Sequence, residues 1–319
     1  MVYFSEKTIS GKKYIYLMKS IRLPDGKVVS LQKIVDKKGD LKKLEEKYRS
    51  FFVEKEKEAY TAFATRNYKT AGVFSKEEMA KIETMKVDYQ RLIKGFSKEQ
   101  YKDVFDRFIA NFTYESNAIE GSSLTLKDVS IVMFENRSLE GKDLREIWET
   151  KNSREVMEKI LKGKFKVNEN DAIKMHKMLM KNIDARVGYK QFPNEILGSS
   201  VKLTPPEKVK EEMGNLIEMY EKNSEKLHPL QMSALFHGKF ERIHPFADGN
   251  GRVGRFIVTA MLVNEGYPPL IIRKTQRDAY IKAIEDFQQG YATNLERFFL
   301  EKYKKTFEKF FAVYAKYVK

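Results

Sequence analysis

The N-terminal part of the chain has the alternation of apolar and polar positions that is typical of β-strands. Residues 13–18 (KYIYLM) and 28–35 (VVSLQKIV) are rich in β-branched and aromatic side chains, which favour strands. Between them, residues 24–27 (PDGK) contain the proline, aspartate and glycine that tight turns use. The pattern therefore predicts a β-hairpin at the N-terminus.

From residue 40 onward the apolar positions recur with the period of an α-helix, and the pattern predicts a mainly helical protein. Ser75 and Ser97 stand at expected N-caps, because acidic residues follow each of them in the first turn. The segment between Gly188 and Thr204 has an extended pattern instead and predicts a second, short hairpin. The predicted helices cover about residues 40–68, 75–94, 97–118, 140–162, 168–182, 205–223, 229–243, 251–265, 276–289 and 292–316.

Composition and charge narrow the function classes. The chain has 319 residues, of which 33% are charged and 42% hydrophobic, as in globular proteins. Its net charge of +15 suggests a nucleic-acid partner at first sight. However, the lysines are mixed with glutamates, as in residues 42–47 (KKLEEK), which favours an ordinary solvated surface. We therefore do not expect a nucleic-acid partner.

The sequence also limits the chemistry and the location of the protein. There is no cysteine, which excludes disulfides, thiolate catalysis and cysteine-ligated zinc. The first residues lack the apolar core of a signal peptide, and no segment has the roughly eighteen uninterrupted apolar residues of a membrane span. We therefore expect a cytoplasmic protein that does not bind a membrane.

One short segment, residues 244–255 (HPFADGNGRVGR), concentrates polar chemistry at the start of a predicted helix. Gly249-Asn250-Gly251 exposes consecutive backbone N–H groups, and the positive end of the helix dipole adds to their attraction for anions. Arg252 and Arg255 lie three residues apart on that helix, so their guanidinium groups can hold phosphate oxygens together. This part of the segment predicts a phosphate site.

The same segment supplies a carboxylate and an imidazole beside the phosphate site. Asp248 provides the kind of oxygen that Mg²⁺ takes when the ion also binds substrate phosphates. His244 can accept a proton near neutral pH from an attacking hydroxyl. Phe246 has no such chemistry and is expected to anchor the segment in the core.

Three other interpretations of the segment are open. Residues 249–254 match G-x-G-x-x-G, the turn of dinucleotide-binding folds, although a helix rather than a strand is predicted before it. His237, Glu241 and His244 share a helical face and could bind zinc or iron with His176, although Pro245 suggests that the helix ends near His244. His237 and Glu241 would otherwise form a buried polar pair that braces the loop. Finally, the segment could be an ordinary capped helix.

Residues 244–255 resemble the signature of the Fic family, H-P-F-x-[D/E]-G-N-G-R-x-x-R, at every specified position. Fic domains are helical, and the resemblance implies transfer of AMP from ATP to a Ser, Thr or Tyr hydroxyl of a target protein, which can be the protein itself. It further implies His244 as the base and Asp248 as the Mg²⁺ ligand. The groups that would hold ATP are Gly249, Asn250, Gly251, Arg252 and Arg255.

Two more segments extend the resemblance. Residues 189–203 resemble the family's flap, a hairpin that holds the target segment by main-chain pairing. Residues 116–121 (SNAIEG) resemble the inhibitory motif [S/T]-x-x-x-E-[G/N] of family members that restrain themselves. This implies that Glu120, with Ser116, pairs with Arg255 and keeps the γ-phosphate of ATP from docking. The expected target-docking residues are Tyr189, Lys190, Gln191, Ile196 and Leu197.

Together these observations predict a mainly α protein, a Fic-type helical bundle with a short β-hairpin flap. We expect an N-terminal extension over residues 1–95 and a catalytic domain over 96–319, with the inhibitory helix at about 97–121. The expected activity is that of an autoinhibited protein adenylyltransferase that uses ATP and Mg²⁺. Removal of AMP from a modified target, use of another phosphate-containing donor, and a non-catalytic nucleic-acid-binding role remain alternatives. The sequence is compatible with a homo-oligomer.

Overall fold

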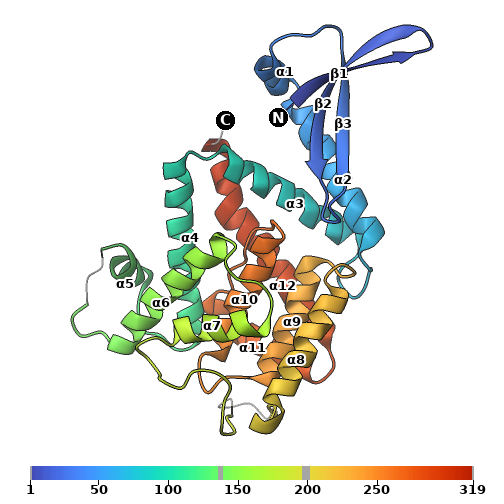
Figure 1. Cartoon of the computed structure of the whole chain (residues 1–319). Helices are drawn as coiled ribbons and strands as arrows, with labels where there is room; N and C mark the ends of the chain where they lie inside the picture. Colours follow the sequence, from blue (N-terminus) through green and yellow to red (C-terminus); the bar gives the residue numbers. More distant parts are fainter. Residues whose placement is uncertain (1, 136–138, 196–201, 318–319) are drawn as a thin grey trace. The chain divides into compact units, whose positions relative to one another are not determined.

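The computed structural model describes residues 2–135, 139–195 and 202–317. Within these residues the chain forms twelve α-helices and one small antiparallel sheet (Figure 1). Contacts divide the chain into two compact units, Met1–Thr70 with Ser75–Asp88, and Ala71–Phe74 with Tyr89–Lys319. The elements are β1 (Val2–Ile9), β2 (Lys12–Arg22), β3 (Val28–Val35), α1 (Leu41–Lys47), α2 (Arg49–Asn67), α3 (Lys76–Gly95), α4 (Lys98–Ile119), α5 (Leu126–Ser130), α6 (Leu144–Leu161), α7 (Glu169–Leu179), α8 (Pro206–Asn223), α9 (Pro229–Ile243), α10 (Asn250–Asn264), α11 (Arg277–Gln288) and α12 (Ala292–Thr306).

The first unit contains the predicted N-terminal hairpin as strands β2 and β3, which pair so that Ile21 lies opposite Val29. A third strand, β1, pairs antiparallel with β2 on its other side, giving the order β1-β2-β3. The sequence pattern does not predict β1, because this edge strand buries only Val2 and thus lacks alternating apolar positions. The buried Leu17 of β2 packs in one core cluster with Phe52 and Tyr60 of α2.

The single helix expected over residues 40–68 is two helices. Asp40 caps α1 by accepting a hydrogen bond from the backbone of Lys43 (3.0 Å). The helix stops at Tyr48, whose φ of −102° and ψ of 16° are not helical, and α2 begins directly after it. The helical period of the sequence continues through this point, which explains why the pattern does not show the break.

The second unit is helical and is built around α9 and α10, which flank the loop of residues 244–249. These two helices pack on each other, and α10 also packs against α4, α6 and α7. Most residues of both helices are buried. Gly254 allows their close approach, since a Cβ there would lie 2.9 Å from Glu241 Oε1 and equally close to the His237 ring.

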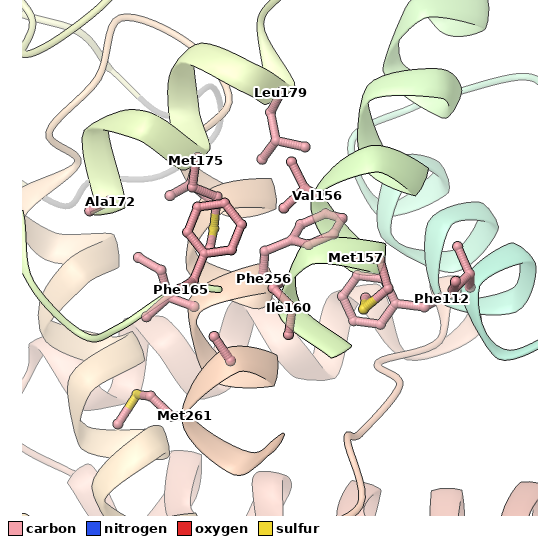
Figure 2. Close-up of a cluster of buried hydrophobic side chains, with 14 of the residues drawn as sticks. Phe112, Val156, Met157, Ile160, Phe165, Ala172, Met175, Leu179, Phe256 and Met261 are labelled. Atoms are coloured by element: carbon pink, nitrogen blue, oxygen red, sulfur yellow. The ribbon is translucent and has the colours of Figure 1, made fainter. Parts of the chain in front are cut away.

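Apolar side chains from four helices meet behind the loop. Figure 2 shows Phe112 of α4, Met157 of α6, Met175 of α7 and Phe256 of α10 in this cluster. The Phe112 and Phe256 rings are 5.0 Å apart between centroids and meet edge to face. The cluster fixes the start of α10 relative to α4 and α6, which carry further residues of the site described below.

Several helix ends agree with the sequence and a few elements do not. Ser97 forms a capping box with Gln100, and Ser75 accepts a hydrogen bond from the backbone of Glu78 (3.1 Å), so both predicted caps are present. The sequence pattern does not predict the short helix α5, which is followed by a π-helical turn over Ile131–Glu135. The last predicted helix ends as an α-helix at Thr306 and continues as π and 3₁₀ turns.

The hairpin expected between Gly188 and Thr204 is not seen in the part of it that the structure describes. Residues 189–195 and 202–204 form no strand, and residues 196–201 lie outside the described residues. At the two described ends of this segment, backbone N–H groups bond to the catalytic-loop side of the molecule, one to the loop itself and one to the last turn of α9. The backbone N–H of Lys190 donates to Pro245 O (2.9 Å), and that of Thr204 donates to Arg242 O (3.3 Å).

Across the described ranges, no helix is both long enough and apolar enough to span a lipid bilayer.

Candidate active site

The loop of residues 244–249 turns sharply at His244. This residue ends α9 in the left-handed conformation (φ 49°, ψ 58°), which is uncommon outside glycine and often occurs at functional sites. Phe246 is fully buried and stacks on His176 with 3.9 Å between the ring centroids, so it anchors the loop as predicted. The loop is therefore rigidly held beside the start of α10.

Asn250 closes the loop with its side chain. The amide oxygen accepts a hydrogen bond from the backbone N–H of Phe246 (2.8 Å), and the amide nitrogen donates to Phe246 O (2.8 Å). The residue is only 2% exposed. Its side-chain amide is therefore used within the loop, whereas the first N–H groups of α10, at residues 250–252, have no acceptor inside the helix. The backbone, rather than the Asn250 amide, is the natural anion donor here.

His244 is held so that it can act as a base. Its Nδ1 lies 3.3 Å from Glu241 O, and because a carbonyl can only accept, this contact needs a proton on Nδ1 and leaves the lone pair on Nε2. Burial lowers the pKa of His244 to about 4, and the charge of Lys190 acts in the same direction. The imidazole is consequently neutral at pH 7 and free to accept a proton.

A buried polar network lies behind His244. Tyr280 Oη and His237 Nε2 are 2.6 Å apart, and Glu241 Oε1 lies 3.7 Å from the same nitrogen. Burial raises the pKa of Glu241 to about 8, although the charge of Arg255 acts against it, so this carboxyl is protonated at neutral pH. The predicted role of His237 and Glu241 as a buried pair that braces the loop agrees with this geometry.

The structure does not support the other interpretations of the loop. The described residues contain no group of three or more His, Asp or Glu side chains placed to share a metal ion, which speaks against the zinc or iron site. Helix α9, not a strand, precedes the glycine turn, so the dinucleotide-binding interpretation is also wrong. The N-cap of α10 is Gly249, whose φ is 77° and which has no side chain to cap the helix.

A cavity of about 460 Å³ opens over the loop and the start of α10. His244, Asp248 and the turn of residues 249–251 line it together with residues from α6 and the end of α4. Arg252, only 2% exposed, also lines it; its Nη1 lies 3.2 Å from Glu149 Oε1 but without hydrogen-bond geometry. The guanidinium of Arg252 is therefore held in the cavity wall beside Glu149, and its Nη1 has no hydrogen-bond acceptor among the described residues.

Arg255 lies deeper and is bound by helix α4. Its Nη2 donates to Glu120 Oε1 (2.7 Å) and to Ser116 O (3.0 Å), and its Nε donates to Ser116 Oγ (2.9 Å). Glu120 is the C-cap of α4 and lines the cavity. It comes so close to Gly251 that a side chain at that position would collide with its carboxylate. The residues expected to form the inhibitory contact are therefore together in space.

Other side chains fasten the end of α4, and the sequence does not single them out. Arg277 Nε donates to Ile119 O (2.9 Å). Glu146 of α6 accepts a hydrogen bond from Ser123 Oγ (2.9 Å) in the turn that follows α4. These contacts set the position of Glu120 beside Arg255.

Asp248 has a partner that sequence reasoning does not identify. Its Oδ2 contacts Nη2 of Arg145 on α6, and Arg145 Nε donates to Glu149 Oε1 (3.1 Å). Burial alone would raise the pKa of Asp248, but the hydrogen bond from Arg145 and the charges of Arg252 and Arg145 outweigh it and lower that pKa. An arginine four residues before a glutamate is a common helix-surface pair, so the sequence gives no signal of this role.

Of the expected flap residues, Tyr189, Lys190 and Gln191 are described, and Ile196 and Leu197 lie outside the described residues. Lys190 is 3% exposed, and its Nζ donates to Asn194 Oδ1 (2.7 Å). Asn194 Nδ2 in turn donates to Phe246 O (2.9 Å). This segment therefore supports the loop, and Asn194 is a second supporting residue that the sequence does not single out.

Comparisons with known proteins find similarity to one family. Residues 166–262 match the model of the Fic/DOC family. The relative named protein adenylyltransferase Fic from Drosophila virilis is 29% identical over 204 residues, covering 61% of this chain and 41% of that protein. The chain thus spans about two fifths of the length of the curated relatives it matches.

Solved structures share the fold. A Fic domain containing signaling protein from Bacteroides thetaiotaomicron superposes with a TM-score of 0.66 at 22% identity, covering 73% of this chain and 96% of that one. A Fic family protein from Desulfovibrio desulfuricans gives 0.60 at 26% identity, covering 73% and 74%. Together with the signature that turns around His244, these comparisons show that residues 166–262 match the Fic/DOC family model and that the chain is similar in sequence and fold to proteins of that family.

Proposed function

We propose that this protein is an adenylyltransferase that moves AMP from ATP to a Ser, Thr or Tyr hydroxyl of a target protein. The observation that carries the proposal is one cavity lined by a neutral histidine, by Arg252 and by the start of α10, whose first N–H groups have no acceptor inside the helix. The similarity to relatives named protein adenylyltransferase supports the same activity.

In this mechanism His244 Nε2 takes the proton of the target hydroxyl. The hydroxyl oxygen then forms a bond to the α-phosphorus of ATP, the bond from that phosphorus to the bridging oxygen breaks, and pyrophosphate leaves. Because the imidazole is neutral at pH 7, no prior deprotonation is needed. The backbone N–H groups of residues 250–252 and the guanidinium of Arg252 would stabilise the charge on the phosphates.

The cavity fits a divalent cation that accompanies the nucleotide. Six carboxylates but only two guanidinium groups line it, so free ATP would be repelled by its walls. Asp248, whose lowered pKa keeps it ionised, is the side chain that would hold Mg²⁺. When bound, Mg²⁺ would supply positive charge to the phosphates.

Glu120 would restrain this activity. Its carboxylate already occupies Nη2 of Arg255, a donor that the γ-phosphate needs, and its negative charge repels the nucleotide. Ser116 holds the same guanidinium from the other side and so supports the inhibited state.

The target segment would lie across residues 189–191, next to the catalytic loop. The contact from Lys190 N–H to Pro245 O ties this segment to the residue after the base. Extended main-chain pairing with the target would position a hydroxyl while demanding little sequence. The protein itself would serve as one target.

The test uses ATP labelled at the α-phosphate and the Glu120→Gly protein, which should modify itself more strongly than the unchanged protein. Adding His244→Ala should lower incorporation at least about 100-fold, the usual contribution of a general base, while ATP affinity is retained. Lys239→Ala, an exposed change on α9, is the control. Equal labelling with and without His244 would overturn the proposal, and mass spectrometry of the adduct would identify any other donor.

Removal of AMP is a second candidate function, because Glu120 and His244 line the same cavity and the glutamate could orient an attacking water there. Incubating the unchanged protein with an AMP-modified target tests this directly. Release of AMP that stops in the Glu120→Gly protein would support it, and a stable adduct would exclude it.

A further inference from the structure

Arg145 holds the carboxylate that the proposed function assigns to the metal. It is the second residue of α6, and its backbone N–H is capped by Asp143 (2.8 Å). From there its side chain reaches Asp248, over a hundred residues further along the chain. The contact thus joins α6 to the catalytic loop, and both residues line the cavity.

The two oxygens of Asp248 have different partners. Oδ1 accepts the backbone N–H of Gly249 (2.5 Å), an interaction that fixes the carboxylate within the loop. Oδ2 contacts Arg145 Nη2. Arg252 Nη2 lies 4.0 Å from Oδ1, beyond hydrogen-bond distance. The oxygen best placed to bind a cation is therefore the one that Arg145 occupies.

The side chain of Arg145 can release Asp248 without losing its other ion-pair partner. Its Nε donates to Glu149 Oε1 (3.1 Å) one turn along the same helix, whereas Nη2 makes the contact with Asp248. The side chain of Arg145 is 47% exposed and that of Glu149 is 10% exposed. Rotation about the Nε contact would release Asp248 while the guanidinium stays paired with Glu149.

We propose that Arg145 takes the place of the divalent cation on Asp248 in the nucleotide-free protein and is displaced when the metal-bound nucleotide enters. This inference rests on the proposed function. In this arrangement the protein supplies two substitutes for its ligands. Glu120 offers a carboxylate to Arg255 where a phosphate would bind, and Arg145 offers a cation to Asp248. The two contacts are made by different helices, α6 and α4, so each can be removed separately.

The experiment measures how much Mg²⁺ improves ATP binding. In the Glu120→Gly protein, titration calorimetry gives the Kd for ATP with excess EDTA and again with saturating Mg²⁺. The Kd with EDTA divided by the Kd with Mg²⁺ is the factor by which the metal improves ATP binding. Arg145→Ala should increase this ratio about two- to fivefold, the range for a partly exposed ion pair. Because each ratio compares one protein under two conditions, a change in its folded fraction cancels.

Two matched variants control the measurement. Lys159→Ala removes another cation of α6, which pairs with Glu155 on the same helix and does not line the cavity. This change should leave the ratio unchanged. In an Asp248→Asn background, Arg145→Ala should lose its effect because the contested carboxylate is gone. An effect of equal size in that background would contradict the inference.

The remaining outcomes separate this inference from the proposed function. If Arg145→Ala still binds ATP but its ratio is unchanged or smaller, Arg145 is not a substitute for the cation, and the proposed function stands. A loss of ATP affinity confined to the EDTA condition would make Arg145 a phosphate ligand instead. If the Glu120→Gly protein binds ATP under neither condition, the proposed function fails and the inference fails with it.

Discussion

Replacement of Glu241 by glutamine should stabilise the protein, and the gain should depend on pH. Burial raises the pKa of this carboxyl from 4.5 to about 8, so the folded protein holds a proton there that the unfolded chain releases above pH 4.5. The associated stability is complete below pH 4.5 and is lost as the pH rises through 8. Glutamine keeps the shape of the side chain and has no proton to lose.

The expected size follows from this difference in pKa. Each pH unit above 4.5 costs the folded protein about 1.36 kcal/mol of stability, because the unfolded chain has released the proton and the folded protein has not. The cost is therefore about 3 kcal/mol at pH 7 and less than about 1 kcal/mol at pH 5. Because Glu241 is 5% exposed, solvent screens little of this cost. Glutamine should therefore raise the free energy of unfolding strongly at pH 7 and hardly at all at pH 5.

Urea unfolding followed by circular dichroism at pH 5, 7 and 8.5 would measure the gain. Glu221→Gln, an exposed change on α8, is the matched control and should show no trend. A Glu241→Gln protein that is less stable than the original at every pH, or equally changed at pH 5 and pH 7, would refute the argument. The first result would mean that the ionised carboxylate is an essential partner of His237 or His244.

Three further predictions concern the loop and its supports. Because the pKa of His244 is lowered to about 4, the rate of transfer by the Glu120→Gly protein should be nearly constant from pH 6 to 8 and fall only below about pH 5. Initial rates would show this, and a midpoint near pH 6.5 would contradict the argument that burial lowers the pKa. Phe246→Ala should cost about 3–5 kcal/mol in unfolding free energy, since the ring is fully buried; a loss below 1 kcal/mol would mean that it does not anchor the loop. Ser116→Ala removes one hydrogen bond to Arg255 and should raise self-modification about two- to tenfold in a labelling assay, whereas unchanged labelling would make Ser116 irrelevant to restraint.

The sequence predicts most of the helices and the glycine turn before α10 because their signals are local. Ser97 with its capping box and the turn at Gly249 both lie within a few residues of the structure they specify. The pairing of Glu120 with Arg255 joins distant parts of the chain, and only the resemblance to a family indicates it.

What the sequence does not predict depends on tertiary contacts. Arg145 has an ordinary helical partner in Glu149, so its contact with Asp248 has no local signature. Asn250 is expected to hold phosphate, yet its amide bonds within the loop, a choice that only the folded turn decides. The extended pattern after Gly188 suggests a hairpin, but the N–H groups of Lys190 and Thr204 at its described ends bond to Pro245 in the loop and to Arg242 in the last turn of α9. These two groups are therefore not available for strand pairing with each other.

The left-handed backbone conformation of His244 lowers the stability of the fold at the position that carries the proposed base. A left-handed residue with a side chain costs roughly 1–2 kcal/mol more than glycine at the same position. Glycine at position 244 would therefore relax the turn while removing the base. Stability alone would favour glycine at this turn, so the proposed role of the imidazole as a base gives a reason for a histidine there.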